Sequence, residues 1–308
     1  MSFRARLLNF WLRHVEKPTL RRMADAQGLR RRLEWSARMF FHAPRGTQMQ
    51  WQVLEHDGRR ADVLEVVPEE LSSTAVIFYI HGGGFIFGSP RTHAAMAAAL
   101  GKRLAARVVM PRYRRAPEAP FPAAFDDVRV AFDGLCASGV PARQIVIGGD
   151  SAGGALALAL LGQLLADQAD LPGAVFCFSP LTDLSYSGDS FRYNSEVEAV
   201  LPADRAAQMA EMYLQGHAAD DPRASPLFAN FAGAPPVWIT AGDTEILRDD
   251  ARRMTALMQA SKVAVTYIEQ RDLPHAWPIF HNILPEARQT LDDLADWIRQ
   301  QLPQAGGN

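Results

Sequence analysis

The chain has 308 residues, an apolar fraction of 48%, a charged fraction of 21% and a formal net charge of −2. This apolar content excludes intrinsic disorder as the main state, and the small net charge argues against nucleic acid as the principal partner. The two cysteines, Cys136 and Cys177, are too few for a disulfide framework and fit a reducing compartment.

The N-terminal 45 residues differ from the rest in charge. They contain eleven Lys and Arg against three acids, a net charge of +8, which leaves −10 for the remaining chain. Large apolar residues recur there mostly every three or four positions, and this spacing predicts amphipathic helices, interrupted at Pro18 and Gly28. These apolar residues are Phe3, Leu7, Phe10, Trp11 and Val15. We expect this stripe to pack on the main domain, with a membrane-surface helix as the alternative.

The same segment is a poor match to a targeting signal. Its apolar run, residues 7–12, contains Asn9 and stops at Arg13, and no small-residue cleavage site follows. No stretch of the chain approaches the roughly 20 apolar residues of a membrane span. The sequence therefore predicts a cytoplasmic protein and argues against contact with a membrane.

From residue 48 the periodicity changes. Apolar residues alternate on both sides of Asp57-Gly58, which predicts a β-hairpin. Strand-like and helix-like segments then alternate for more than two hundred residues, which indicates an α/β fold with a mainly parallel sheet and helices on both faces. The expected strands are residues 75–80, 107–110, 144–147, 174–178, 237–240 and 263–268, and the expected helices are 94–104, 123–136, 152–166, 248–260 and 285–302.

Residues 185–235 interrupt this alternation. They contain no convincing strand and one helical patch near residues 202–214. An insertion between two strands is the simplest interpretation, and such insertions can cover the carboxyl edge of the sheet, where open α/β folds bind ligands.

The first chemical motif is Gly149-Asp150-Ser151-Ala152-Gly153, between an expected strand and an expected helix. This is the G-x-S-x-G pattern of a nucleophile elbow, in which a serine occupies a sharp, strained turn. Side chains at the flanking glycines would collide with neighbouring backbone, and the following helix directs free N–H groups at the site. The pattern predicts a nucleophilic serine.

The second motif, His81-Gly82-Gly83-Gly84-Phe85, directly follows the strand at residues 75–80. Three successive glycines leave backbone N–H groups accessible to a substrate oxygen, as an oxyanion hole requires. A phosphate-binding loop is excluded because neither G-x-x-x-x-G-K-[ST] nor G-x-G-x-x-G occurs at this position.

A base and an acid are expected after later strands. His275 follows the strand at residues 263–268, and both Asp243 and Glu245 follow the strand at 237–240. The chain order serine, acid, histidine is that of α/β-hydrolases. The spacing alone does not choose between the two carboxylates.

Together these pieces resemble the hormone-sensitive lipase family of α/β-hydrolases, including its bacterial carboxylesterases. The resemblance runs from about Val76 to Trp297 and also rests on the stretch from Tyr113 to Asp127, which reads Y-R-R-A-P-E and then P-F-P-A-A-F-D-D. The family usually has leucine where this chain has Arg115, a departure that we interpret as neutral for catalysis.

The resemblance assigns roles to the motif residues. It implies that Ser151 is the nucleophile and His275 the general base. The family's acid begins the pattern D-P-L-R-D. Residues 245–249, which read E-I-L-R-D, match it in register with glutamate in place of the first aspartate, so the resemblance favours Glu245 over Asp243. It further implies oxyanion-hole N–H groups from Gly83, Gly84 and Ala152, and a surrounding layer formed by His81, Tyr113, Asp126 and Asp150, with Tyr113 and Asp126 supporting the glycine loop.

The resemblance also implies a domain organisation. Residues 1–45 and 185–235 would form a two-part helical cap over the acyl pocket, and residues 46–184 and 236–308 the catalytic domain. The positive first segment would then dock on the negative remainder through its charge.

The predicted function is a serine carboxylesterase for small-molecule esters with short to medium acyl chains, with lactones as a further candidate class. No metal or organic cofactor is implied. The alternatives are an amidase or deacetylase with the same residues, a membrane-surface lipase, and a ligand-binding protein without activity. A homodimer formed through the strand at residues 263–268 is an expectation by analogy only.

Overall fold

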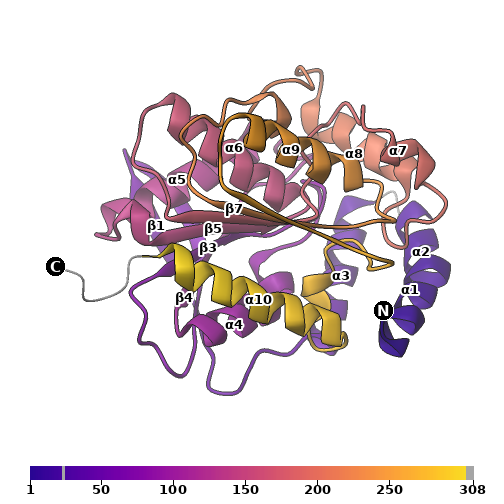
Figure 1. Ribbon diagram of the computed structural model, residues 1–308, viewed down its shortest axis with the longest axis horizontal. Helices are drawn as coiled ribbons and strands as arrows, with labels where there is room; N and C mark the ends of the chain where they lie inside the picture. Colours follow the sequence, from indigo (N-terminus) through magenta and orange to yellow (C-terminus); the bar gives the residue numbers. More distant parts are fainter. Residues whose placement is uncertain (23–24, 303–308) are drawn as a thin grey trace.

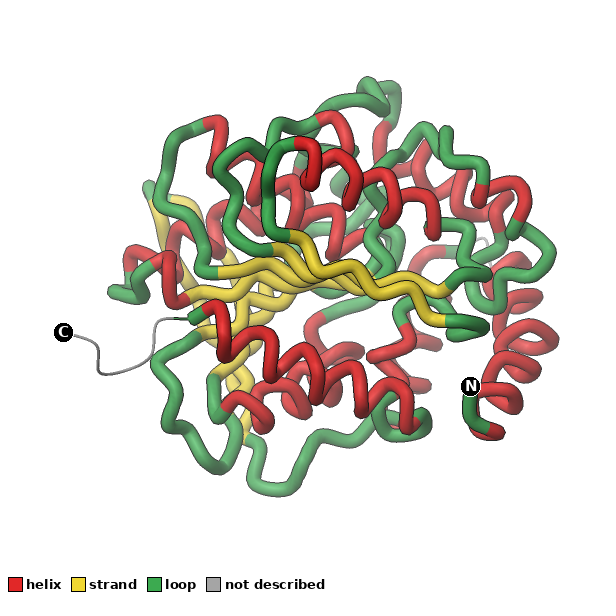
Figure 2. The backbone as a smooth tube through the Cα atoms, viewed as in Figure 1, coloured by secondary structure: helices red, strands yellow, loops and turns green. Residues whose placement is uncertain are grey.

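The computed structural model describes residues 1–22 and 25–302, and its centre is a twisted eight-stranded sheet (Figures 1 and 2). The strand order is β1-β2-β4-β3-β5-β6-β7-β8, and the pairs from β4 to β8 are parallel. The strands are β1 (Gln48–His56), β2 (Arg59–Val67), β3 (Val76–Ile80), β4 (Arg107–Pro111), β5 (Ile145–Asp150), β6 (Ala174–Phe178), β7 (Val237–Gly242) and β8 (Val265–Gln270).

The predicted hairpin is confirmed as the antiparallel edge of this sheet. β1 and β2 pair with His56 opposite Arg59, so Asp57 and Gly58 alone form the turn. Both have positive φ, +48° and +73°, as a two-residue turn between twisted strands requires.

Helices cover both faces of the sheet, which confirms the predicted α/β architecture. In Figure 1, α4 (Pro90–Leu104) and α10 (Pro285–Gln301) lie on one face, and α5 (Ala123–Ala137), α6 (Ala152–Ala166) and α9 (Arg248–Ala260) lie on the other. Every residue of β3, β5, β6 and β7 is buried, as expected for parallel strands covered on both sides.

The N-terminal helices are not interrupted at Pro18 and Gly28, where the sequence predicted breaks. They are α1 (Phe3–Trp11), a π-helical segment (Leu12–Glu16), α2 (Lys17–Arg22) and α3 (Ala26–Phe40). Pro18 does not end a helix. The π-helical segment directly precedes α2, and the Lys17 N–H bonds to the Leu12 carbonyl, five residues earlier, so the helical chain continues through Pro18. Gly28 lies inside the first turn of α3, where its N–H donates to the Asp25 carboxylate (2.8 Å).

The prediction of which side of α1 packs on the main domain is wrong. Phe3, Leu7 and Phe10 point to solvent, whereas Ala5 and Leu8 are buried. Ala5 and Leu8 belong to a small apolar cluster, and a small side chain at position 5 lets α1 approach the segment beneath it. The other buried members of this cluster are Leu12, Ala199, Leu273, Trp277, Leu284 and Ala287.

Few ion pairs join the positive N-terminal residues 1–45 to the negative remainder of the chain. In the part of the chain that the structure describes, two ion pairs join it to later segments, Arg21–Asp204 (2.9 Å) and Arg30–Glu118 (2.7 Å). Other basic side chains donate to backbone carbonyls instead, such as Arg13 to Val197 (2.7 Å). Most of the positive charge is therefore not neutralised by the acidic remainder.

The insertion between β6 and β7 is helical, as predicted. It contains α7 (Ser190–Tyr193), α8 (Ala203–Leu214) and a 3-10 turn (Pro226–Phe228). With α1, α2 and α3 it lies beyond the carboxyl ends of the strands (Figure 1). None of the described helices is long and apolar enough to cross a membrane.

Candidate active site

Ser151 occupies the turn between β5 and α6 in a strained conformation. Its φ is +53°, a region that residues with a side chain rarely adopt. A Cβ on Gly149 would lie 2.4 Å from the Gly153 carbonyl oxygen, and one on Gly153 would lie 2.1 Å from the Ile80 oxygen. The turn therefore requires glycine on both sides of Ser151, which explains the spacing of the motif.

His275 lies in the loop after β8 and contacts Glu245, which follows β7. The His275 Nδ1 atom is 2.6 Å from Glu245 Oε2, and both side chains are buried. His275 Nε2 is also buried and forms no hydrogen bond with any described residue. Ser151 and His275 line the same cavity, and no hydrogen bond joins the Ser151 hydroxyl to Nε2 in the described part of the chain.

Glu245 is held by groups from two neighbouring strand ends. Its Oε1 accepts hydrogen bonds from the Ser179 hydroxyl (2.7 Å) and from the Gly242 N–H. The Ser179 Oγ in turn accepts from the Ala276 N–H (3.0 Å). Ser179 thus joins the glutamate to the histidine loop, a position that no motif in the sequence indicates.

Asp243, the other candidate acid, has a different partner. Its Oδ1 accepts a hydrogen bond from the Asp272 N–H (2.8 Å). The structure therefore brings Glu245 and not Asp243 against His275, and Asp243 stabilises the turn that leads to the histidine loop.

The environment of His275 favours its charged form. Burial lowers the pKa of the imidazole, but the Glu245 carboxylate raises it by charge and hydrogen bond, and the net effect is an increase above 6.5. A carboxylate in this position also fixes the tautomer that bears a proton on Nδ1.

A second buried carboxylate, Glu198, lies beside this pair and was not predicted. It comes from the insertion and accepts hydrogen bonds from the Val200 N–H (2.8 Å) and the Ile246 N–H (3.0 Å). Burial and, next, the charge of Glu245 raise the pKa of Glu198. Glu198 therefore connects the insertion to the residue that follows Glu245.

The glycine loop has backbone groups free for a ligand. Gly83 and Gly84 have φ of +119° and +55°, conformations that suit glycine. None of the hydrogen bonds between described residues uses the N–H groups of Gly83, Gly84 or Ala152. Gly82 differs, because its N–H donates to Asp150 Oδ1 (3.0 Å).

Asp150 and His81 hold this loop from beneath. Asp150 Oδ1 also accepts from the Tyr79 hydroxyl (2.7 Å), and Oδ2 is 3.4 Å from His93 Nε2. The Tyr113 hydroxyl donates to the His81 carbonyl (2.8 Å), and the two rings stack. His93, in α4, was not among the predicted residues.

The two histidines of this layer, His93 and His81, differ in their protonation. Burial opposes the charged forms of both His93 and Asp150, but their mutual attraction prevails, so the pKa of His93 is raised and that of Asp150 is lowered. Burial and then the neighbouring His93 lower the pKa of His81 to about 3, which keeps His81 neutral.

Asp126 does not support the glycine loop as expected. Among the residues that the structure describes, no hydrogen bond joins its carboxylate to that loop, and the next residue, Asp127, instead binds Arg114 (2.9 Å). Asp126 and Asp127 occupy adjacent positions of α5, about 100° apart around the helix, so they cannot serve the same neighbour. Arg115, the departure from the family pattern, donates to the Gly88 carbonyl at the end of the loop.

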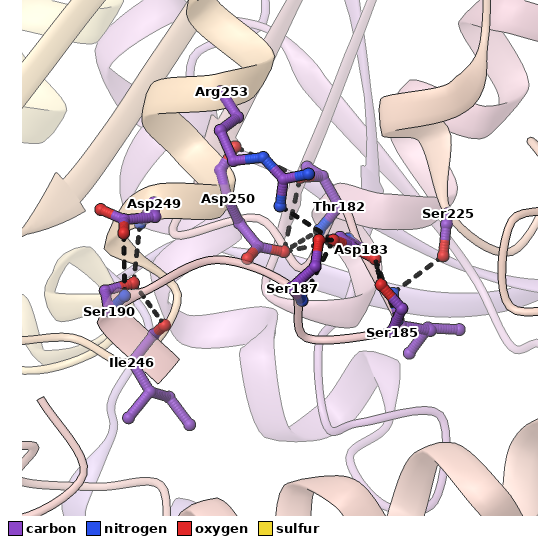
Figure 3. A network of polar contacts seen from close by, with 11 residues as sticks. Thr182, Asp183, Ser185, Ser187, Ser190, Ser225, Ile246, Asp249, Asp250 and Arg253 are labelled. Carbon is purple, nitrogen blue, oxygen red and sulfur yellow. Dashed lines mark hydrogen bonds and ion pairs between the residues drawn. The ribbon is translucent and has the colours of Figure 1, made fainter. Parts of the chain in front are cut away.

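A polar network fixes the segment that connects β6 to the insertion (Figure 3). Asp250 Oδ2 accepts from the backbone N–H groups of Thr182 (2.7 Å) and Asp183 (3.0 Å), and Arg253 pairs with Asp183 (2.8 Å). Asp249 accepts from the Ser190 N–H (2.8 Å). The first turn of α9, which begins three residues after Glu245, is thereby joined to the start of the insertion.

The cavity above Ser151 has a volume of about 800 Å³. Its floor contains Ser151, His275, Gly83 and Gly84, and its roof comes from α1, α3 and α8. Arg30 of α3 connects roof and floor by donating to the Ile86 and Ala116 carbonyls (both 2.7 Å). Within residues 1–22 and 25–302, no cluster of His, Cys, Asp or Glu could hold a metal ion.

Comparisons with known proteins agree with this geometry. A family model described as alpha/beta hydrolase fold matches residues 77–279. The chain is 37% identical over 223 residues to an acetyl-hydrolase of Streptomyces hygroscopicus, covering 72% of this chain and 75% of that protein. It is 34% identical over 234 residues to an esterase of Acinetobacter venetianus, with coverages of 76% and 77%. A crystal structure of an esterase from the bacterial hormone-sensitive lipase family superimposes with a TM-score of 0.89 at 31% identity, over 98% of this chain and 99% of the other.

Proposed function

Since the chain belongs to the hormone-sensitive lipase family of α/β-hydrolases and is a serine ester hydrolase, we propose that it cleaves short- to medium-chain acyl esters through an acyl-enzyme on Ser151. The observation that carries this proposal is the arrangement of His275, whose Nδ1 contacts Glu245 at 2.6 Å while its buried Nε2 remains free beside the cavity that Ser151 lines.

In the proposed acylation step, Nε2 of His275 removes the proton from the Ser151 hydroxyl as the oxygen attacks the ester carbonyl. The imidazolium then gives that proton to the leaving alcohol as the carbon–oxygen bond breaks. Glu245 stabilises the imidazolium and fixes its orientation, which is why its buried contact with Nδ1 matters.

The N–H groups of Gly83, Gly84 and Ala152 stabilise the negative oxygen of the tetrahedral intermediate in this proposal. They are free of other hydrogen bonds among the described residues, and Ala152 begins α6, whose dipole favours negative charge. Water then attacks the acyl-enzyme with His275 as the base, and Ser151 leaves with its proton restored.

The cavity supports an ester with a sizeable apolar part. Its 800 Å³ lies in the upper part of the range of ligand pockets, and most of its lining is apolar, including Leu181, Leu184 and Met209. Residues 1–45 and 185–235 act as the two-part cap that limits the acyl chain. Lactones that fit this space are further candidate substrates.

The test is hydrolysis of p-nitrophenyl esters from acetate to laurate by the wild type and by Ser151→Ala. We expect Ser151→Ala to lose at least ~10⁴-fold in kcat. Ser261→Ala, a matched change at the end of α9 where the hydroxyl donates to the Leu257 carbonyl, should keep wild-type activity. Mass spectrometry after rapid quenching should find the acyl group on Ser151. Activity of Ser151→Ala within tenfold of the wild type would refute the assignment.

A further inference from the structure

The N-terminal helices expose an unusual amount of apolar surface. Of the fifteen large apolar side chains that are exposed among the described residues, nine lie within the first forty residues. On α1, Phe3, Leu7 and Phe10 are 77%, 60% and 61% exposed, and their spacing of four and three places them on one side of the helix. Single exposed apolar residues are ordinary, but a concentration of them marks an interaction surface.

This surface surrounds the mouth of the cavity. Leu7 and Trp11 of α1 and Phe40 of α3 line the cavity although they are 60%, 41% and 53% exposed, so they lie where it opens to solvent. Phe3 and Phe10 do not line the cavity and lie one turn before and one turn after Leu7. These five residues are named the apolar rim below.

The helices that carry the apolar rim, α1 and α3, also carry positive charges that are not neutralised by described carboxylates. Arg6 of α1 and Arg38 of α3 are exposed, and neither has a carboxylate partner in the described part of the chain. Within the first 45 residues, whose net charge is +8, ion pairs with later segments involve Arg21 and Arg30. A partner of this surface must therefore accept both apolar side chains and positive charge.

We propose that the apolar rim docks on an anionic lipid surface. Aromatic and aliphatic side chains beside arginines are the composition of interfacial helices, whose apolar residues enter the acyl boundary while the arginines meet phosphate groups. A second copy of the chain fits less well, because a two-fold contact would bring two segments of +8 together. The cavity opens within the rim, so a docked molecule can take acyl esters directly from the lipid. This last point rests on the proposed function.

The test is flotation of the full chain with vesicles of mixed phosphatidylglycerol and phosphatidylcholine, and with vesicles of phosphatidylcholine alone. The wild type should float with the anionic vesicles, and Phe3→Ser with Phe10→Ser should reduce the bound fraction at least ~10-fold. Arg6→Glu with Arg38→Glu should abolish the preference for anionic vesicles. The matched control is Met49→Ser with Val53→Ser on β1, which removes two apolar side chains of 45% and 46% exposure elsewhere and should float like the wild type.

Hydrolysis of dissolved p-nitrophenyl butyrate separates this proposal from the proposed function. It should be unchanged in all these variants, because Phe3, Phe10, Arg6 and Arg38 do not line the cavity. Hydrolysis of a laurate ester embedded in anionic vesicles should instead fall in the rim variant, Phe3→Ser with Phe10→Ser, and in Arg6→Glu with Arg38→Glu, but not in the control Met49→Ser with Val53→Ser. Loss of dissolved-ester activity in Ser151→Ala bears only on the proposed function.

A second measurement does not depend on any variant. Trp11 and Trp35 lie on the exposed helices, so vesicles with brominated acyl chains should quench tryptophan fluorescence of the wild type. Absence of both flotation and quenching with anionic vesicles would overturn the proposal. So would flotation of the rim variant at the wild-type level, or light scattering that finds a dimer in the wild type and a monomer in the rim variant.

Discussion

The floor of the cavity, at the ends of β3, β5 and β7, and its roof, formed by α1, α3 and α8, are held in different ways. In the floor, Ser151, Glu245 and His275 are all buried, and side-chain hydrogen bonds of 2.6–2.7 Å connect Glu245 to its neighbours. In the roof, Arg30 of α3 donates to backbone carbonyls, and large apolar side chains face solvent.

The difference separates two requirements of an ester hydrolase. Proton transfer and oxyanion stabilisation depend on distances that must hold to a few tenths of an ångström, so the floor is built from close backbone approaches and satisfied buried charges. In our two proposals the roof selects acyl chains and contacts a lipid surface, and both tasks need apolar area rather than fixed geometry. Changes in the floor should therefore reduce kcat, and changes in the roof should alter KM, stability or binding.

The largest effect within this comparison is expected from Glu245→Gln. The amide cannot stabilise an imidazolium, so kcat should fall ~10³- to 10⁴-fold with little change in KM. Asp243→Asn is the matched change two residues earlier and should retain activity within about tenfold, since its partner is the Asp272 N–H. Steady-state kinetics at pH 8 measures both. The reverse ranking would mean that Asp243 is the acid.

Asp150→Asn tests whether the layer beneath the glycine loop also belongs to the floor. Loss of the charge that holds Gly82 and His93 should lower kcat about 10- to 100-fold, less than the loss of an oxyanion donor itself. An unchanged kcat together with a lowered melting temperature would make the layer structural only.

The His93–Asp150 pair beneath the glycine loop predicts a pH dependence of stability. His93 has a folded-state pKa above 6.5, so its contribution is complete below pH 6.5 and is lost as the pH rises through the folded-state pKa. Asp150 has a folded-state pKa below 3.8, so its contribution is complete above pH 3.8 and is lost as the pH falls through the folded-state pKa. The free energy of unfolding of the wild type, measured by chemical denaturation, should therefore fall on both sides of pH 3.8–6.5. His93→Gln should show a flatter profile.

The sequence predicts the floor well because its geometry is local. The backbone collisions at Gly149 and Gly153 require G-x-S-x-G, and the order of strands brings Ser151 and His275 to one sheet edge. The choice of Glu245 needed the family pattern, since Asp243 is only two residues away. Ser179, Glu198 and His93 were missed because each comes from a loop or helix without a motif and acts through the tertiary structure.

The roof was predicted less well for a different reason. Periodicity gives the spacing of apolar residues but not which side of a helix is buried, and α1 is apolar on both sides. The fit of Ala5 and Leu8 against Trp277 and Leu284 decides the orientation, and it leaves Phe3 exposed. Such a fit depends on side chains about 270 to 280 residues away along the chain.

Arg30→Met sharpens the comparison at the point where roof and floor meet. Its two bonds to the Ile86 and Ala116 carbonyls are worth about 1.5–3 kcal/mol together, whereas the half-exposed pair with Glu118 contributes under ~1 kcal/mol. Arg30→Met should therefore lower the free energy of unfolding more than Glu118→Gln does, and raise KM severalfold with a small change in kcat. Denaturant titration and kinetics measure this. Equal losses would mean that the surface ion pair, not the carbonyl contacts, holds the roof.

The smallest expected effect comes from Glu198→Gln, which lies in the insertion but acts on the floor. The charge of Glu198 raises the pKa of His275, and the acid limb of kcat/KM reports that pKa. Removing the charge should therefore move the acid limb to lower pH by about one unit or less, with kcat at pH 8 within about threefold of the wild type. The exposed Glu196, two residues earlier, offers the control Glu196→Gln, whose limb should not move.

A purely structural Glu198 would give another result. Glutamine offers one carbonyl oxygen to the two N–H groups of Val200 and Ile246, so some loss of stability is expected in either case. A lowered melting temperature with an unmoved acid limb would leave Glu198 as a support of the insertion alone. A moved limb would show that a residue of the insertion shifts the pKa of His275, so that roof and floor are coupled at Glu198.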